Sequence, residues 1–358
     1  MAVNDDLLDA TVRHDIGLRR HSTATLYKII ALLNRIDERL TAEIAKRDPG
    51  SGRFTDRRLN LLLDAVRAIT KEAYNVVTEN FDDEVRQLSA YESEYQIDMF
   101  RRIVPVEIDW VAPSEAQLYA AVHSRPFQGR LLREWYRDLE PSAYKRIRDT
   151  VRMGYVEGRT TDQIVRDIRG TRANGYRDGI LEANRRGTEA MVRTALNHTA
   201  NTARAQVYKT NSDVIKGVKW VSTLDSRTSA ICRARDGKIY PVDSGPRPPA
   251  HVNCRSSTAP VTKSWKELGL NLKEAPPGTR ASMNGQVPDD LVYSSWLRKQ
   301  PVEFQEEVLG KTKATLFRKG EIDLDRFVDR AGNELTLAEL RRKEAEAWER
   351  AGLSTASG

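Results

Sequence analysis

Apolar side chains recur at intervals of three and four through about the first 210 residues of this 358-residue chain, and no other feature constrains its fold as strongly. The pattern predicts amphipathic helices over residues 21–47, over a second segment from Leu59 to Val76, and over residues 82–103. The stretch 48–52 contains a proline and two glycines and therefore ends the first of them. Adjacent amphipathic helices with short links predict an antiparallel helical bundle.

Helical spacing continues through the middle of the chain. Residues 127–154 read as a helix that breaks or restarts at Pro141, since proline is not tolerated in a helix interior. Thr160 and Gln163 have the spacing of a capping box, which places the start of another short helix there, and that helix is predicted to end near Gly170. A long helix rich in small residues is predicted over 178–210.

The period then changes. Residues 214–222 are rich in β-branched and aromatic side chains and predict a strand. The following stretch, up to Val261, is full of glycine, proline, aspartate and serine, which is typical of a compact, loop-rich β module. The remaining tail predicts only short helices, at 296–300, 302–309 and 336–348. The fold class is therefore mainly α with a small β element (α+β): an N-terminal helical bundle, central helices leading into the β module, and a small helical tail.

Charge divides the chain into three segments. Residues 1–120 carry 16 basic and 21 acidic residues, residues 121–255 carry 26 and 14, and residues 256–358 carry 16 of each. The chain's net charge of +7 thus combines an acidic third, a basic middle and a neutral tail. We predict an acidic N-terminal helical domain over 1–120 that acts in docking, a basic core over 121–262, and a C-terminal extension over 263–358. A basic block of this size attracts phosphate backbones or acidic protein surfaces.

Several classes of protein are excluded. No stretch approaches the roughly 18 consecutive apolar residues that a membrane-spanning helix needs. The first fifteen residues are acidic and polar, unlike a secretory signal. Two cysteines in 358 residues do not make a disulfide scaffold. We therefore expect a protein made in the cytoplasm, with no membrane partner.

The most informative cluster holds both cysteines of the chain. Cys232, His251 and Cys254 fall within 23 residues, and all three side chains are zinc-ligand types. A structural zinc site takes four ligands, and Ser229 stands where a Cys-x-x-Cys pair would place the fourth. Three interpretations stay open: a zinc site, two reduced and buried thiols beside a hydrogen-bonded histidine, and a disulfide.

Catalysis is the weaker interpretation of the same stretch. Cys232 and His251 can form a thiol–imidazole pair, but no nucleophile elbow or protease signature surrounds them. Asp225 and Asp236 can be read as a metal-binding acidic pair, but both suit turns better, with Asp236-Gly237 as a hairpin turn. We predict that the chain is not an enzyme.

The order and density of these residues over about 127–262 resemble the signature of phage minor head proteins of the Mu F type, the phage head morphogenesis family. That signature has a long helix, a tryptophan-bearing strand, an Asp-x-Arg-Thr turn, an Asp-Gly, and a close of the form Pro-Pro-x-His-x-x-Cys-Arg. The residues that carry it here are Arg193, Thr194, Asn201, Arg204, Trp220, Asp225, Arg227, Thr228, Cys232, Asp236, Gly237, Pro249, His251, Cys254 and Arg255.

The resemblance implies a virion component, made in the host cytoplasm and placed in the head near the portal vertex. It implies a role in head morphogenesis and in DNA packaging or ejection, with the portal protein as partner. The major capsid or scaffold protein and packaged double-stranded DNA are further partners that it leaves open. Many members carry a second cysteine that would complete a four-ligand zinc site. Ser229 replaces this cysteine here, so the resemblance implies a metal-poor variant. We expect no cofactor, and zinc is the one candidate that the cluster leaves open.

The same resemblance suggests how the signature is held together. We expect Asp225 to pair with Arg227, and Asn201 and Arg204 to tie the long helix to the β module. Two alternatives of other classes remain: a non-specific DNA-binding protein with a zinc-stabilised module, and a Cys/His hydrolase or a toxin carried in the tail.

Overall fold

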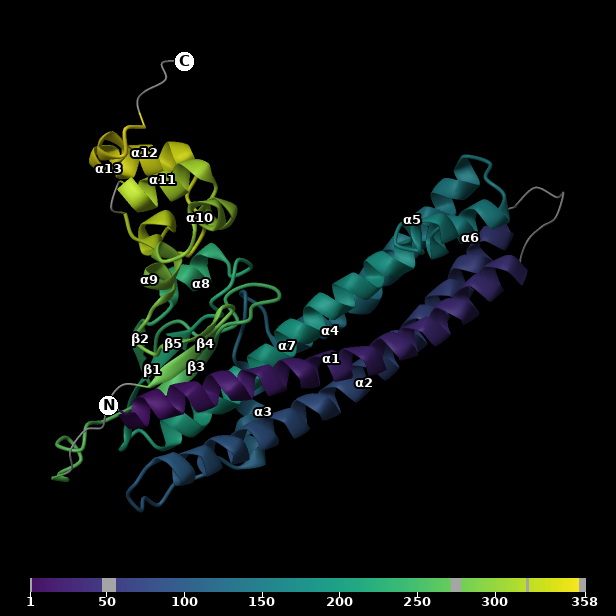
Figure 1. Cartoon of the computed structure of the whole chain (residues 1–358). Helices are drawn as coiled ribbons and strands as arrows, with labels where there is room; N and C mark the ends of the chain where they lie inside the picture. Colours follow the sequence, from purple (N-terminus) through teal and green to yellow (C-terminus); the bar gives the residue numbers. More distant parts are fainter. Residues whose placement is uncertain (1, 47–55, 272–277, 320–321, 354–358) are drawn as a thin grey trace. The chain divides into compact units, whose positions relative to one another are not determined.

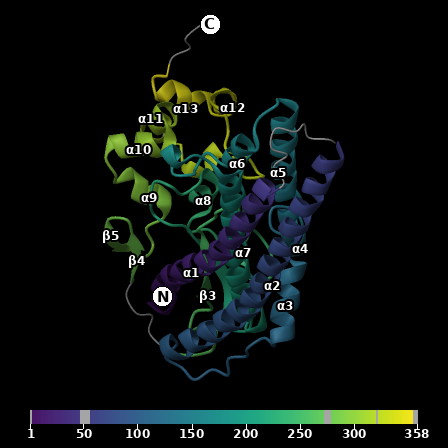
Figure 2. The same cartoon turned by 90° about the vertical axis from the view of Figure 1, so that its right-hand side faces the viewer.

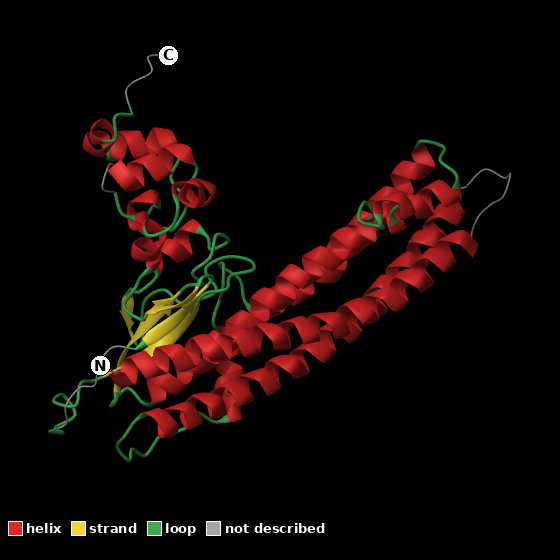
Figure 3. Ribbon diagram, in the orientation of Figure 1, coloured by secondary structure: helices red, strands yellow, loops and turns green. Residues whose placement is uncertain are grey.

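The computed structural model describes residues 2–46, 56–271, 278–319 and 322–353. The fold is mainly α-helical with a small antiparallel sheet, as predicted (Figure 3). Contacts divide the chain into two compact units, which we call unit 1 (1–17, 92–113 and 203–358) and unit 2 (18–91 and 114–202). The three segments predicted from sequence and charge, 1–120, 121–262 and 263–358, stay a prediction.

Figure 1 labels the helices and strands along the chain. The helices are α1 (Ala2–Lys46), α2 (Asp56–Ile103), α3 (Glu115–Ser124), α4 (Leu132–Arg137), α5 (Leu139–Val156), α6 (Thr161–Arg169), α7 (Ile180–Thr210), α8 (Ala230–Arg235), α9 (Tyr293–Arg298), α10 (Val302–Leu309), α11 (Lys311–Lys319), α12 (Leu337–Lys343) and α13 (Ala345–Arg350). The strands are β1 (Ile215–Val221), β2 (Ile239–Pro241), β3 (Ser257–Thr262), β4 (Thr279–Ser282) and β5 (Gly285–Pro288).

Two predictions about the first helices were wrong. Helix α1 begins at residue 2 rather than 21, and α2 runs unbroken where two helices were predicted. Val77, Phe81 and Val85 keep the apolar spacing across the predicted break, and all three are buried. The predicted stop at 48–52 lies outside the described residues.

The central helices follow the sequence signals more closely. The predicted helix over 127–154 is divided into α4 and α5, and Pro141 sits in the first turn of α5, where a missing N–H costs little. Thr160 caps α6 through the predicted capping box with Gln163. Helix α6 ends at Gly170, and α7 matches the predicted long helix.

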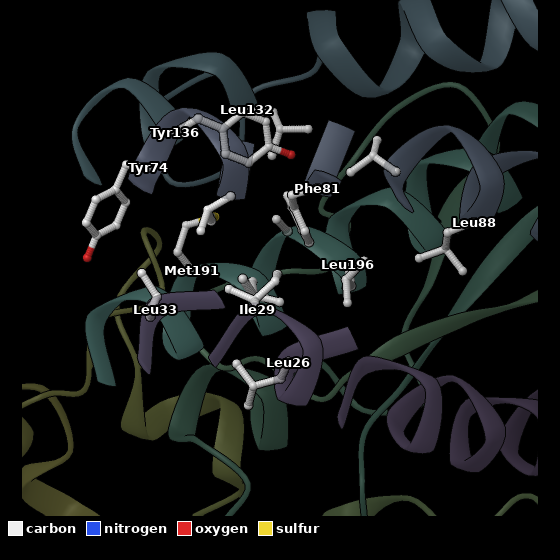
Figure 4. Packing of buried hydrophobic residues seen from close by; sticks show 14 of the residues in the cluster. Leu26, Ile29, Leu33, Tyr74, Phe81, Leu88, Leu132, Tyr136, Met191 and Leu196 are labelled. Atoms are coloured by element: carbon white, nitrogen blue, oxygen red, sulfur yellow. The ribbon is translucent and has the colours of Figure 1, made fainter. Parts of the chain in front are cut away.

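Unit 2 is a helical unit built around two apolar clusters. Parts of α1, α2 and α7 contribute Leu26, Phe81 and Leu196, and α4 covers them with Leu132 and Tyr136 (Figure 4). A second cluster joins α5 and α6 to α1, α2 and the start of α7. It contains Leu40, Ile44, Leu62, Leu63, Val66, Ile147, Val151, Ile164, Ile168 and Leu181.

A buried histidine in unit 2 makes stability depend on pH. His198 is 1% exposed, its Nε2 donates to the carbonyl of Val122 at 3.0 Å, and its ring packs against Phe127. Burial lowers the pKa of His198 from 6.5 to about 4. The folded state therefore binds a proton at His198 less readily than the unfolded state does. The contribution of His198 to the free energy of unfolding is full above pH 6.5 and is lost as the pH falls towards 4.

We expect the free energy of unfolding to drop by about 3 kcal/mol through this group between pH 7 and pH 4. Denaturant unfolding of the wild type and of His198→Gln across that range measures the effect. The difference between the two curves should shrink as the pH falls, and curves that stay parallel would contradict the assignment.

Unit 1 contains the sheet, with strand order β2-β1-β3. Val218 in β1 lies opposite Tyr240 in β2 and Pro260 in β3. Pro260 is tolerated because β3 has a hydrogen-bonded neighbour on one side only. The start of α1 lies on this strand, where the Asn4 side chain accepts a bond of 2.8 Å from the backbone N–H of Thr262.

The C-terminal part of unit 1 is a cluster of short helices, α9 to α13 (Figure 2). Tyr293, Trp296 and Phe317 are fully buried at its centre. The helix predicted at 302–309 is confirmed, while the one predicted from Thr336 to Trp348 is divided into α12 and α13. Helix α11 and the β4–β5 hairpin were not predicted.

Among the described residues, no helix combines the length and the apolar character that crossing a membrane requires.

Candidate functional site

The signature residues after the long helix lie together in unit 1, on β1, α8, β3 and the loops between them. Trp220 of β1 is completely buried, and its indole N–H donates to Ser222 Oγ at 3.0 Å. Cys232 and Cys254 pack in the same small cluster as Trp220. This site therefore has its own core, separate from the larger apolar clusters of the unit.

A salt bridge closes the Asp-x-Arg-Thr turn. Arg255 donates two hydrogen bonds to the Asp225 carboxylate, at 2.5 and 2.8 Å. Thr228 Oγ1 and the backbone N–H of Arg227 donate to the same carboxylate at 3.1 Å each. The predicted partner, the Arg227 side chain, was wrong: Arg227 contributes its backbone, and Arg255 arrives from 30 residues downstream to bind in the bidentate geometry.

This pairing sets the ionisation of Asp225. Partial burial by itself would raise the pKa of the carboxyl, but the Arg255 guanidinium and the hydrogen bonds from Thr228 and Arg227 outweigh it and hold the pKa below its ordinary value. The turn is consequently locked by an ionised carboxylate at neutral pH.

The prediction of Asp236-Gly237 as a hairpin turn was also wrong. These residues follow α8 and lead into β2, with Gly237 at a positive φ of 78°. Asp236 is buried, and its carboxylate accepts from the backbone N–H groups of Ser222 at 2.6 Å and Tyr293 at 2.8 Å. Arg280 of β4 completes the set at 3.1 and 3.3 Å. Asp236 is thus the buried anchor between the signature and the C-terminal part of the unit.

The signature residues on α7 are divided between the two units. In unit 2, Arg193 pairs with Glu189 at 3.0 Å, and Thr194 Oγ1 donates to the carbonyl of Ala190 at 2.6 Å. Asn201 donates to Asn197, so its predicted tie to the β module was wrong. All of these bonds stay within α7, and Arg193 also donates to Thr23 of α1 at 3.5 Å.

Arg204, in unit 1, does tie the helix to the β module. It is fully buried, donates to Ser257 Oγ of β3, pairs with the fully buried Glu92, and pairs with Asp15 at 2.7 Å. His14 Nε2 lies 2.7 Å from Glu92, and its ring stacks on Tyr95. Burial by itself raises the pKa of Glu92, but Arg204 and His14 hold it below its ordinary value.

The candidate metal cluster consists of Cys232, His251 and Cys254, whose side chains are zinc-ligand types, and Ser229 lies beside them. The ligand atoms of Cys232, His251 and Cys254 lie within 4.8 Å of one another. Cys232 Sγ is 3.7 Å from Cys254 Sγ and 3.3 Å from His251 Nε2, and Ser229 Oγ is 2.8 Å from that same nitrogen. Ligands at about 2.3 Å (sulfur) and 2.0 Å (nitrogen) around a tetrahedral ion are separated by about 3.5–3.8 Å. Cys232, His251 and Cys254 are therefore close enough to hold a zinc ion together after small shifts, and Ser229 Oγ lies beside His251 as the neighbouring polar group.

The two thiols differ in their protonation. Hydrogen bonding to Cys254 and burial raise the pKa of Cys232, whereas hydrogen bonds from Cys232 and His251 lower that of Cys254. The hydrogen bond with Cys254 also raises the pKa of His251. Cys232 is 1% exposed, and a buried, protonated thiol is a poor nucleophile.

We predict that Ser229→Cys raises the affinity for Zn²⁺ at least about tenfold, equivalent to 1.4 kcal/mol, because it adds a third thiolate. Competition against a chromophoric chelator measures the affinity. Ser226→Cys is the matched control, since it adds a thiol to the neighbouring turn outside the cluster. Equal affinities for Ser229→Cys and Ser226→Cys would contradict the metal-site geometry.

The remaining signature residue, Pro249, is joined to Pro248 by a cis peptide bond in the loop that leads to His251. The loops of the signature are thus held by its own residues. The turn at Asp225 is bonded to Arg255, and the loop at Pro249 leads to His251 and Cys254. The arrangement defines a small β module braced by buried ion pairs.

Comparison with known proteins agrees with this description. Residues 145–259, about a third of the chain, match the family described as phage Mu protein F like protein. That region covers α6, α7, β1, α8 and β2 and most of the bonded signature. No curated protein and no solved structure matches the chain significantly. Residues 145–259 are therefore similar to the Mu F-like family, and this similarity suggests a phage head morphogenesis protein.

Proposed function

We propose that this chain is a minor structural protein of a phage head, that it associates with the portal vertex, and that it acts in head assembly and in packaging or ejection of DNA. The family match over 145–259 is the observation that carries the proposal. The use of the signature residues supports it. Asp225, Asp236 and Arg204 each form ion pairs within the chain, which suits a rigid assembly element rather than a reaction centre.

We propose that exposed carboxylates of α2 form the docking surface. Asp64 and Glu79 are exposed, and neither has a cationic partner among the described residues. Unpaired surface carboxylates add little to the stability of the chain itself but steer association with a basic partner. We propose that this partner is the portal protein.

Co-sedimentation of the purified chain with portal oligomers tests the proposal, together with mass spectrometry of mature particles. We expect a portal complex and a few copies per particle. Asp64→Asn/Glu79→Gln should weaken the complex, whereas Glu303→Gln/Glu307→Gln, with the same change in charge on α10, should not. Absence from particles combined with failure to sediment with portal would overturn the proposal.

A further inference from the structure

The segment between α6 and α7, residues 170–179, is an exposed loop held in one conformation. Residues 172–178 are all exposed, so no apolar side chain of this loop contributes to a core. Its order comes from Asp178, which accepts from Thr171 N at 2.8 Å, Thr171 Oγ1 at 2.7 Å and Asn174 Nδ2 at 2.8 Å. These bonds, that of Asn174 foremost, lower the pKa of Asp178 and keep it ionised.

Glycines at both ends of the loop allow the two ends to approach each other closely. A Cβ at Gly179 would lie 2.4 Å from backbone atoms of Arg169 and Gly170, and Gly170 itself has a positive φ of 92°. Only glycine allows this close approach at both ends. The loop is therefore a closed arch at the end of α6, beside the first turn of α7 (Figure 1).

The arch presents arginines that have no carboxylate partner. Arg172 and Arg177 are in the loop and Arg166 and Arg169 are in the last turn of α6, and all four are exposed. Within the described residues none of the four forms an ion pair, although Arg169 lies over the Tyr176 ring at 4.9 Å. The one loop carboxylate, Asp178, is already occupied by three internal donors. The four arginines therefore outnumber the local carboxylates, since Asp178 is bonded within the loop and Asp167 of α6 pairs with Arg159.

We propose that this arch, residues 170–179 with the adjoining end of α6, binds the phosphate backbone of double-stranded DNA. Guanidinium groups match phosphate oxygens in geometry and hydrogen bonding. The patch lacks the apolar centre that protein interfaces usually have, since its other side chains are mainly small or polar. Binding through phosphates alone is independent of DNA sequence.

The inference rests on the proposed function and adds a surface for DNA. Its test uses only the purified chain and DNA, so DNA binding can be refuted independently of portal binding. Anisotropy of a labelled random-sequence duplex, titrated with the full chain at several salt concentrations, measures affinity and salt slope. Each lost phosphate contact lowers the log–log slope by about 0.9. We expect Arg172→Gln/Arg177→Gln to lower it by about 2 and to weaken binding at least about tenfold at low salt.

Two further variants separate a positioned loop from bulk charge. Arg35→Gln/Lys71→Gln removes the same charge from exposed residues of α1 and α2 and should bind DNA nearly as the wild type does. Asp178→Ala makes the chain more positive but removes the three bonds that hold the arch, so we expect weaker binding. Tighter binding by Asp178→Ala, or equal losses in the two double variants, would overturn the inference. Unchanged DNA binding by Arg172→Gln/Arg177→Gln with loss of portal binding would also overturn it, and would assign the arch to an acidic protein surface.

Discussion

Replacing Arg204 by methionine should lower the free energy of unfolding by about 3–5 kcal/mol, because it leaves a buried carboxylate without its counter-charge. Glu92 is fully buried, and Arg204 is the only guanidinium that the described residues bring to it. Asp15 and Ser257 lose their donor at the same time. Denaturant unfolding at pH 7.5 measures the loss.

Two comparisons make this result specific to the buried pair. Arg39→Met breaks a salt bridge with Glu72 in which both side chains are more than half exposed, and it should lower the free energy of unfolding far less. Lowering the pH provides the second comparison. Without Arg204, only His14 still opposes the effect of burial, so the pKa of Glu92 should rise and protonation at pH 4–5 should recover part of the stability lost relative to the wild type. A loss that is the same at both pH values would show that Glu92 is not the cause.

The sequence predicted elements wherever a single local signal decides the structure. The capping box at Thr160, the glycine stop at Gly170 and the strand around Trp220 each depend on a few neighbouring residues. The long helix predicted over 178–210 also followed from its own composition. These signals need no knowledge of the rest of the fold.

The start of α1 was missed because polar residues occupy its buried face. Thr11 and His14 stand at positions where apolar residues would have continued the pattern. Thr11 Oγ1 donates to the carbonyl of Leu7, and His14 is bonded to Glu92 from α2. A buried polar residue with a distant partner looks like an exposed one in a periodicity analysis.

The signature itself was located correctly, but its pairings were not. Asp225 was assigned to Arg227, two residues away, whereas the fold brings Arg255 to it. Asp236 was read as a turn residue because Asp-Gly is a strong turn signal, yet its partner Arg280 lies 44 residues away in a segment without any motif. Long-range partners of a charged residue depend on the tertiary structure, and no local pattern encodes them.

Arg280→Met tests the second of these long-range pairs, and we again expect a loss of about 3–5 kcal/mol. Arg280 and Asp236 are both nearly or completely buried, and Arg280 Nη2 also donates to the carbonyl of Ser222 at 2.7 Å. Lys238→Met is the matched control, since Lys238 pairs with Asp325 at the surface, where about half of each side chain is exposed. It should cost less than about 1 kcal/mol.

The location of the damage should distinguish this pair from the Arg204 network. Asp236 bonds to Tyr293 at the start of α9, and Arg280 belongs to the β4–β5 hairpin, so the weakened contacts join the C-terminal helices to the signature. Hydrogen exchange in Arg280→Met should therefore accelerate in residues 278–319 and 322–353 before it does in α7. Asp236→Asn combined with Arg280→Met should cost less than the sum of the single changes, because each removes the other's uncompensated charge. Additive losses, or faster exchange spread evenly over unit 1, would mean that this ion pair does not fasten the C-terminal helices to the Mu F-like module.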